Sequence, residues 1–458
     1  MRDMIRVALI KIRGVAGVQD QVLADIGRTI SRLARLGLDP VVVVDPADVA
    51  ETGYVTHERM ADLTRLANRI QTGIERDGRK SVVVPPMFSR TTADTGLKWT
   101  VPHLLLLPMT SKIIPVVVPV AYDEHASRNT LCAADDVVIE LASRIAGLAR
   151  PDVIALDKVI FLDPVGGIPS TERGAAHVLV NIEQEYDAIM NELTDKRHVA
   201  NLTALKRVLE LSPASTSGLV TTLQVAASQS TRNPLIYNLL TDRPVISSSL
   251  PVDGKRAPAQ ATTLLRRGMP VMLVYSPGGM SLPTVTGPTP DIVNGLVVCD
   301  RVAEVDMAKL VELIENSFGR TLDVGRYLAR VNGNIAGLVI AGDYEGGAII
   351  TWENKPGSDR VAYLDKFAVQ RRSQGSAGVA DIVFKAMVGL FSKELVWRSR
   401  TENVVNKWYF DRSNGMVKLP PGENGTKWTV FYTGTETRER PDVAAYVAVC
   451  SGVEPSFK

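Results

Sequence analysis

Apolar and polar positions alternate in two patterns over roughly the first 270 residues. Residues 40–44, Pro-Val-Val-Val-Val, are too apolar and β-branched for anything but a strand buried on both faces. Residues 21–36 instead place their apolar side chains at helical spacing. Both patterns recur, with strands expected at 7–12, 82–84, 114–120, 159–163, 245–248 and 271–275, and helices at 59–72, 133–146, 172–193 and 198–211. This alternation predicts an αβα sandwich around a mainly parallel sheet.

A break in the pattern follows at residues 276–290. Seven of these fifteen residues are Gly or Pro, which neither a helix nor a central strand tolerates. We therefore expect a first domain at 1–275, a linker at 276–290 and a second domain at 291–458.

The second domain has a different order of elements. Residues 379–391 repeat their apolar side chains at i, i+3 and i+4, and Asp306 is suited to cap a helix that begins at Met307. Helices are expected at 307–318, 323–330, 379–391 and 404–411, and strands at 335–341, 347–353, 361–369, 395–400 and 428–433. The order α-α-β-β-β-α-β-α-β predicts an α+β domain.

Composition narrows the classes of function. The chain of 458 residues suffices for two or three domains, and 45% apolar with 22% charged residues is typical of a globular protein. Lys and Arg (52) nearly balance Asp and Glu (50), which argues against a broad nucleic-acid surface. We expect no membrane span, because no apolar run approaches about 18 residues. The first fourteen residues lack the layout of a signal peptide.

Cysteine and histidine placement limits the chemistry. The three cysteines are far apart, which excludes a disulfide framework and a CxxC metal site. All five histidines precede residue 200, so the second domain must act without an imidazole base or histidine metal ligands. We expect no metal.

A Gly-rich turn between the strand at 361–369 and the helix at 379–391 is the most informative segment. Gly375, Ala377 and Gly378 keep bulky side chains away from the helix start, where unpaired N–H groups and the helix dipole favour an anion. Arg372 adds a donor fork suited to phosphate. An ordinary strand–helix turn with exposed arginines is the alternative interpretation.

These residues carry a resemblance. Arg372-Ser-Gln-Gly375-Ser-Ala377 resembles the Gln/Arg-x-x-Gly-x-Gly/Ala pyrophosphate loop of the GNAT acetyltransferases, which bind acetyl-CoA. Together with Leu364-Asp-Lys-Phe367 and the segment 397–410, it is similar to the acetyltransferase domain of N-acetylglutamate synthases of the fungal and animal type. One departure is Val404, which stands where that family usually has Pro.

The resemblance implies roles for individual residues. Acetyl-CoA would be bound by residues of the strand end and the loop, namely Phe367, Ala368, Val369, Arg372, Gly375, Ser376, Ala377 and Gly378. Glutamate would be held by Lys366, Arg398, Arg400 and Asn406, and the catalytic residues would be Tyr409 and Asn403. Arg398 and Arg400 are two residues apart in a strand and therefore point to the same face. The alternative interpretation is that this face is exposed to solvent and binds no substrate.

The residues near these motifs favour a direct mechanism. They include neither His nor Cys, so we expect the amine to attack the thioester without an acetyl-enzyme. Backbone N–H groups at a break in the strand 363–369 would stabilise the oxyanion. Tyr409 could protonate the leaving thiolate, although a tyrosine with a purely structural role in the core fits the sequence as well.

The first domain resembles the amino-acid kinase family, specifically acetylglutamate kinase, in residues 7–12, 114–120, 129–136 and 157–167. That family's phosphate loop reads Lys-x-Gly-Gly, whereas this chain reads Lys11-Ile12-Arg13-Gly14. An arginine would obstruct the close approach of a phosphate that glycine permits. We expect a kinase fold without kinase chemistry, which by resemblance binds arginine as a regulatory domain.

The expected function is therefore acetyl transfer from acetyl-CoA to the α-amine of L-glutamate, the first step of arginine biosynthesis, with inhibition by L-arginine. Two alternatives stay open: an acetylglutamate kinase with a regulatory acetyltransferase-like domain, and a non-catalytic arginine-sensing subunit. The resemblance also implies a homo-oligomer, association with acetylglutamate kinase and a location in the mitochondrial matrix.

Overall fold

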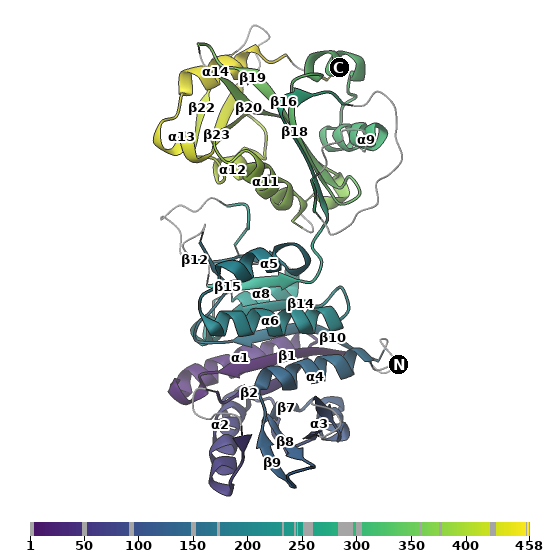
Figure 1. Cartoon of the computed structure of the whole chain (residues 1–458). Coiled ribbons are helices and arrows are strands. Elements are labelled where there is room, and N and C mark those ends of the chain that lie inside the picture. The colour runs from purple at the N-terminus through teal and green to yellow at the C-terminus, as the bar shows by residue number, and fades with distance from the viewer. Residues whose placement is uncertain are drawn as a thin grey trace. The chain divides into compact units, whose positions relative to one another are not determined.

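The chain forms two compact units (Figure 1). The first comprises Met1–Ile246 and Gly254–Arg267, and the second comprises Ser247–Asp253 and Gly268–Lys458. The computed structural model describes residues 4–47, 53–90, 96–147, 153–171, 175–230, 233–241, 244, 246–250, 260–282, 296–298, 305–357, 359–374, 378–421, 427–454 and 456–457.

An eight-stranded sheet forms the centre of the first unit. Its order is β13-β15-β14-β10-β1-β2-β7-β4, and only the β14–β15 pair is antiparallel. The strands are β1 (Ile5–Arg13), β2 (Asp39–Asp45), β4 (Ser81–Val84), β7 (Ile114–Val117), β10 (Ile154–Leu162), β13 (Leu179–Asn181), β14 (Ser217–Thr221) and β15 (Ala261–Leu265). The mainly parallel sheet confirms the expected fold class.

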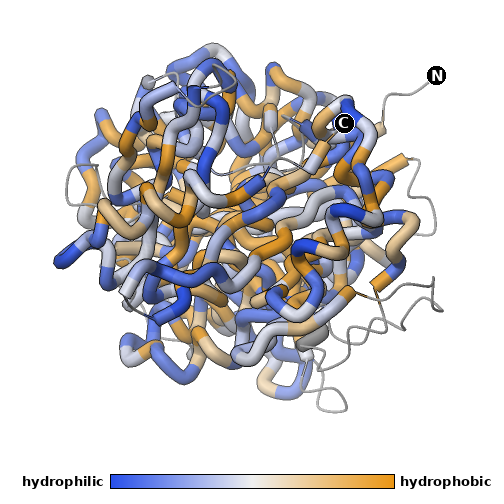
Figure 2. The backbone as a smooth tube through the Cα atoms, turned by 90° about the horizontal axis from the view of Figure 1, so that it is seen from above, coloured by the Kyte–Doolittle hydropathy of each residue, from blue (hydrophilic) through white to orange (hydrophobic). Residues whose placement is uncertain are grey.

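Apolar side chains bury both faces of this sheet. Along β1, Val7 and Leu9 belong to one core cluster, while Ala8, Ile10 and Ile12 belong to the other. The helices are α1 (Asp20–Arg35), α2 (His57–Glu75), α3 (His103–Thr110), α4 (Ala134–Gly147), α5 (Ile182–Glu192), α6 (Lys196–Leu211), α7 (Leu223–Ala227) and α8 (Pro234–Thr241). Apolar and polar segments alternate along the chain in Figure 2.

Several predicted boundaries in this unit were wrong. The expected strand at 114–120 is divided, because β8 (Val120–Asp123) joins a separate five-stranded sheet of order β3-β9-β8-β5-β6. The helix expected from 172 begins only at Ile182, after β13. The expected strand at 245–248 is absent from its described residues, and β15, which was not predicted, completes the sheet.

The further strands of the smaller sheets are short, which explains why no periodicity indicated them. They are β3 (Gly53–Tyr54), β5 (Phe88–Arg90), β6 (Leu97–Trp99), β9 (Arg128–Leu131) and the hairpin β11 (Pro169–Ser170) and β12 (Ala175–Ala176).

The second unit also has an eight-stranded sheet, of order β17-β16-β18-β19-β20-β21-β23-β22. The strands are β16 (Val271–Met280), β17 (Leu296–Val298), β18 (Ile335–Ala341), β19 (Gly346–Asn354), β20 (Arg360–Val369), β21 (Leu395–Arg400), β22 (Gly415–Lys418) and β23 (Trp428–Thr433). The helices are α9 (Met307–Phe318), α10 (Val324–Val331), α11 (Val379–Leu390), α12 (Asn406–Phe410), α13 (Thr435–Glu439) and α14 (Val443–Gly452). All nine elements expected here are present.

The expected boundary between the domains was misplaced. Strand β16 pairs with β18, so it belongs to the second unit, which resumes at Gly268. The glycines that suggested a linker at 276 lie where the register of this pair is irregular, between Tyr275 and Met280. Gly279 has φ 90°, and a Cβ there would lie 2.2 Å from the carbonyl oxygen of Gly333. Glycine in a strand often marks such an irregularity. Residues 283–290 of the expected linker lie outside the described residues.

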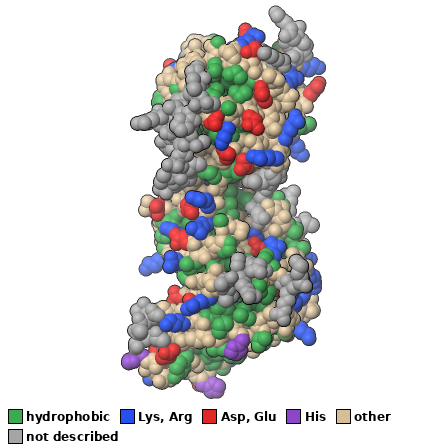
Figure 3. Space-filling model, turned by 90° about the vertical axis from the view of Figure 1, so that its right-hand side faces the viewer, with side chains coloured by type: hydrophobic (Ala, Val, Ile, Leu, Met, Phe, Trp, Pro, Cys, Tyr) green, Lys and Arg blue, Asp and Glu red, His purple; other side chains and the backbone are tan. Residues whose placement is uncertain are grey.

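Helices cover both faces of the second sheet. Core residues of α11 pack on one face, and those of α9 and α10 pack on the other. Asp306 caps α9 as expected, because its Oδ1 accepts from the backbone N–H groups of Ala308 and Lys309. None of the described helices has the length and apolar composition needed to cross a membrane. On the face shown in Figure 3, basic and acidic side chains are interspersed.

Candidate active site

Two neighbouring parallel strands of the second sheet separate near its middle. Strands β20 and β21 pair only at Ala362↔Leu395 and Tyr363↔Val396, although β20 continues to Val369 and β21 to Arg400. Paired strands satisfy each other's backbone hydrogen bonds. Beyond Tyr363, the facing edges of β20 and β21 can therefore bond to another group. Of the residues expected to contact acetyl-CoA and glutamate, Lys366, Phe367, Ala368 and Val369 lie on the arm of β20, and Arg398 and Arg400 lie on the arm of β21.

A β-bulge interrupts β20 on its other side, at Asp365. Ile350 lies opposite Leu364 and Ile349 lies opposite Lys366, so Asp365 has no residue opposite it in β19. This is the strand break that the sequence led us to expect. A bulge re-aims side chains, and here Asp365 and Lys366 both contact groups on the same face of the sheet.

The bulge supports a buried cluster of charges. Asp365 forms ion pairs with Arg330 of α10 and, at 2.7 Å, with Lys366. Lys366 also donates to Ser456 Oγ (2.8 Å) and lies 4.8 Å from the ring centre of Tyr327. Burial raises the pKa of Asp365, but Lys366 and Arg330 outweigh it and the net direction is downward. Burial lowers the pKa of Lys366, although Asp365 opposes this.

Arg398 and Arg400 lie on one face of β21 as expected, but in different surroundings. The guanidinium of Arg398 donates to the carbonyl oxygens of Cys450 and Val453 at the end of α14, and it lies 4.3 Å from the ring centre of Trp428. Arg400 is exposed. Arg398 therefore holds the C-terminal segment in place by satisfying carbonyls that the helix leaves unpaired.

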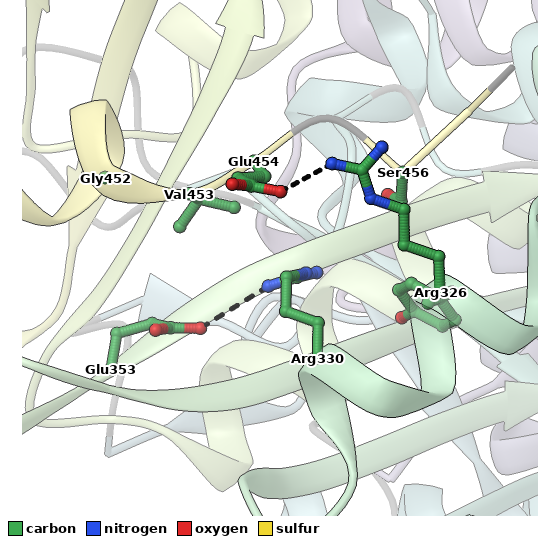
Figure 4. A pocket seen from close by; sticks show the side chains of 8 residues that line it. Arg326, Arg330, Glu353, Gly452, Val453, Glu454 and Ser456 are labelled. Atoms are coloured by element: carbon green, nitrogen blue, oxygen red, sulfur yellow. Dashed lines mark hydrogen bonds and ion pairs between the residues drawn. The ribbon is translucent and has the colours of Figure 1, made fainter.

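A cavity of about 240 Å³ lies beside this cluster (Figure 4). Arg330 faces Glu353 at 3.7 Å, and Arg326 pairs with Glu454 at 2.7 Å. The cavity is lined by Arg326, Tyr327, Arg330, Glu353, Gly452, Val453, Glu454 and Ser456. Lys366 and Arg398 bond to its C-terminal wall through Ser456 and Val453. Burial raises the pKa of Glu353.

Sequence reasoning missed most of the cavity. Arg326, Tyr327 and Arg330 belong to α10, more than thirty residues before Lys366, and Glu454 and Ser456 follow α14. In the sequence, their charged side chains cannot be distinguished from the solvent-exposed charges of an ordinary amphipathic helix or chain end. Only an expectation that α10 packs beside β20 could have singled them out.

Tyr409 lies among aromatic rings on the α11 face of the sheet. Its ring centre is 5.6 Å from that of Trp397 and 6.3 Å from that of Phe367. The side chain is buried, which raises its pKa. Tyr409 is therefore protonated at neutral pH, and burial makes it a weaker acid than an exposed tyrosine. Lys366 and Tyr409 thus lie in different core layers, one on each side of the diverging strands.

The two asparagines shape the turn that leads from β21 to Tyr409. Asn403 donates to Ser399 Oγ (2.9 Å) and accepts from the backbone N–H of Val405 (3.1 Å). Asn406 donates to the carbonyl oxygens of Arg400 (2.8 Å) and Thr401 (3.0 Å). These bonds fix the turn in which Val404 replaces the expected proline.

The Gly-rich loop is described only at its edges. Gly375, Ser376 and Ala377 lie outside the described residues. Gly378 caps α11 with φ 68°, a left-handed conformation that glycine adopts easily. Arg372 is exposed within the short 3₁₀ turn Arg371–Ser373. Helix α11 is thus the next α-helix after β20 in the chain, and a helix N-terminus is a position where a phosphate group could bind.

In the first unit, two cations at the end of β1 lie close to carboxylates. Lys11 is 1% exposed, and its Nζ lies 2.5 Å from Asp135 and 4.0 Å from Asp45. It also donates to Asn201 at 2.9 Å. Arg13 lies 4.0 Å from the same Asp45. These lysine and arginine groups are therefore engaged with protein carboxylates.

The described residues contain no cluster of three or more His, Cys, Asp or Glu that could hold a metal ion. The diverging parallel strands, the bulge and the following helix define the class of the second unit, which is an N-acetyltransferase domain. Residues 298–452 match the family model "NAT, N-acetyltransferase, of N-acetylglutamate synthase".

Full-length relatives identify the family. The chain is 40% identical to the mitochondrial amino-acid acetyltransferase of Yarrowia lipolytica, covering 99% of this chain and 81% of that one. The corresponding enzyme of Candida albicans is 33% identical with the same two coverages. The chain belongs to the amino-acid acetyltransferase family. It is an acyltransferase with acetyl-CoA as co-substrate, which confirms the predicted enzyme class.

The solved structures are more distant. A Neisseria gonorrhoeae N-acetylglutamate synthase complexed with coenzyme A and N-acetyl-glutamate matches 95% of this chain and 96% of its own at 14% identity and a TM-score of 0.48.

Asp365→Asn should destabilise the protein by about 3–5 kcal/mol at pH 7, because it leaves the buried Lys366 and the half-buried Arg330 without their shared counter-charge. The pKa of Asp365 is lower in the folded chain than its unfolded value of about 3.9, so its contribution is complete above that pH and is lost as the pH falls through the folded pKa. Denaturant unfolding measured from pH 8 to pH 3 should show the difference in unfolding free energy between the wild type and Asp365→Asn becoming smaller as the pH falls. Asp343→Asn, at an exposed ion pair with Lys309, is the matched control. Equal effects of the two variants would contradict the prediction.

Proposed function

We propose that the chain transfers the acetyl group of acetyl-CoA to the α-amine of L-glutamate, giving N-acetylglutamate and CoA. The observation that carries the proposal is the divergence of β20 and β21, which has a buried cationic cluster on one side and a protonated tyrosine on the other. The family membership and the matching family model support the same reaction.

The cavity beside Lys366 suits an amino acid. A zwitterionic substrate with a second carboxylate needs cations for its carboxylates and a carboxylate for its ammonium. Arg326, Arg330 and Glu353 supply both kinds of group on the cavity wall. Lys366 and Arg398 hold the opposite wall. We assign this cavity to the acceptor.

Acetyl-CoA would occupy the opening between the strands. Its pyrophosphate would bind the N-terminus of α11 with Arg372, and its pantetheine arm would bond to the edge of β20 at Phe367, Ala368 and Val369. This directs the thioester carbonyl toward the bulge at Asp365, where backbone N–H groups can stabilise an oxyanion.

The reaction then needs no covalent enzyme intermediate. The neutral amine of glutamate forms a bond to the thioester carbon, and the tetrahedral intermediate expels the thiolate of CoA as its C–S bond breaks. The attacking nitrogen releases one proton to solvent as the amide forms. Tyr409 is protonated at neutral pH and donates a proton to this thiolate, although the burial that raises its pKa makes it a weaker acid than an exposed tyrosine. The resulting tyrosinate regains a proton from solvent, so the net change is the movement of one proton from nitrogen to sulfur.

The first alternative, an acetylglutamate kinase, is disfavoured by the phosphate loop, where Arg13 replaces glycine and Lys11 is buried among carboxylates. The second alternative, a non-catalytic subunit, is disfavoured by family membership.

CoA release should be fastest with L-glutamate and lower by about tenfold to a hundredfold in kcat/KM with L-glutamine, since one charge-assisted contact accounts for roughly 1.5–3 kcal/mol. L-Aspartate should also be poor, because its side chain is shorter. ATP consumption with N-acetylglutamate, measured in parallel, should be absent. Equal rates with glutamine would refute glutamate recognition, and ATP turnover would favour the kinase.

We further propose that the kinase-like unit binds L-arginine and inhibits the transferase. A neisserial N-acetylglutamate synthase has been solved in complex with coenzyme A and L-arginine. The cations of the proposed phosphate loop, Lys11 and Arg13, lie close to carboxylates of the protein itself. This arrangement fits a regulatory role better than phosphoryl transfer. We also propose a mitochondrial location, as the names of the relatives indicate. The homo-oligomer and the association with acetylglutamate kinase stay predictions from resemblance.

Titration of the full-length chain with L-arginine should reduce CoA release; tenfold inhibition needs only about 1.4 kcal/mol of coupling. L-Lysine, which carries the same charge without a guanidinium group, is the control and should have little effect. The sensor role would be excluded by activity that arginine leaves unchanged or that lysine lowers equally.

A further inference from the structure

Arg412 is the only arginine among the described residues that is buried, with 5% of its surface exposed. It lies three residues after Tyr409, just beyond the end of α12. A charged group removed from water is stable only when paired and hydrogen-bonded. The partners of Arg412 therefore indicate what it holds together.

One set of partners lies outside α12. Nη2 of Arg412 donates to Asp381 Oδ1 (2.9 Å) and to Ser247 Oγ (3.0 Å), and Nε donates to Ser249 Oγ (2.6 Å). Ser249 Oγ also donates to Asp381 Oδ1 (2.5 Å), which closes a triangle of three side chains. Asp381 is in the first turn of α11, the helix proposed to bind the pyrophosphate.

The second set of partners belongs to α12. Nη1 of Arg412 donates to the carbonyl oxygen of Trp408 (3.1 Å), and the guanidinium carbon lies 3.9 Å from the centre of the Trp408 ring. The backbone N–H of Arg412 donates to the carbonyl oxygen of Tyr409 (3.0 Å). One side chain thus joins the helix that carries Tyr409 to the first turn of α11.

The two serines come from an unexpected part of the sequence. Residues Ser247–Asp253 belong to the transferase unit, yet the chain on both sides of them, up to Ile246 and from Gly254, belongs to the kinase-like unit. The transferase unit therefore includes a short segment that precedes its own first strand.

We propose that Arg412 is a positioning residue for the transfer reaction, which holds α12 and Tyr409 in place against α11 through Asp381, Ser247 and Ser249. This inference rests on the proposed role of Tyr409 as proton donor. A donor must lie within hydrogen-bond distance of the leaving sulfur. The planar fork of Arg412 can satisfy several acceptors at fixed angles, which a lysine cannot do.

Arg412→Gln in the full-length chain should lower kcat roughly tenfold to a hundredfold, the range expected when a reacting group is displaced by about 1 Å. The KM for glutamate should change little, because the acceptor cavity lies on the other side of the strands. In a Tyr409→Phe background the same substitution should lower kcat less than about twofold, since no hydroxyl remains to be positioned. Arg412→Lys should restore little activity. Arg438→Gln, at an exposed arginine of α13, is the matched control.

A second variant covers the case in which Arg412→Gln does not fold. Ser247→Ala combined with Ser249→Ala keeps the Arg412–Asp381 pair and should give a smaller decrease in kcat with the same dependence on Tyr409. The positioning role would be overturned by variants with normal kcat, or by equal decreases in kcat in the wild-type and Tyr409→Phe backgrounds. It would also be overturned by a Tyr409→Phe enzyme as active as the wild type. A wild-type chain that acetylates no amino acid would instead contradict the proposed function itself.

Discussion

The site depends on the way β20 leaves its two neighbours. On one side its pairing with β21 ends at Tyr363, and on the other the bulge at Asp365 shifts its register against β19. The first change frees backbone groups at the centre of the sheet, and the second places Asp365 and Lys366 together on one face. Without the bulge, strict alternation would direct Asp365 and Lys366 to opposite faces, and the cluster with Arg330 could not form.

The cluster of Asp365, Lys366 and Arg330 contributes both to the stability of the fold and to the proposed acceptor site. Asp365 is the shared counter-charge of two cations, and its pKa is lowered because their charges outweigh the effect of its burial. Lys366 in turn reaches Ser456, and Arg398 reaches the carbonyl of Val453, so the C-terminal segment is fastened over the same face. The charged groups proposed to bind the acceptor are therefore held in place before any ligand binds. This limits the reorganisation of these side chains that the reaction requires.

The sequence predicted those features that local patterns encode. The uniform Pro40–Val44 run identified a strand buried on both faces, and the apolar face of residues 379–391 identified α11. It failed where tertiary pairing overrides a local signal. Gly278 and Gly279 suggested a linker but lie in an irregular strand, and the cavity residues of α10 and the C-terminus meet only in the folded chain. Arg412 was missed for the same reason, because its partners Ser247 and Ser249 lie more than 160 residues away.

The central claim is that the diverging edge of β20 binds acetyl-CoA. Hydrogen exchange of backbone amides, measured on the full-length chain with and without CoA, tests it most directly. The account predicts slower exchange in residues 365–369 and in the first turn of α11 when CoA is bound, and no comparable change on adding glutamate alone. Unchanged exchange in β20, with protection confined to the first unit, would contradict it.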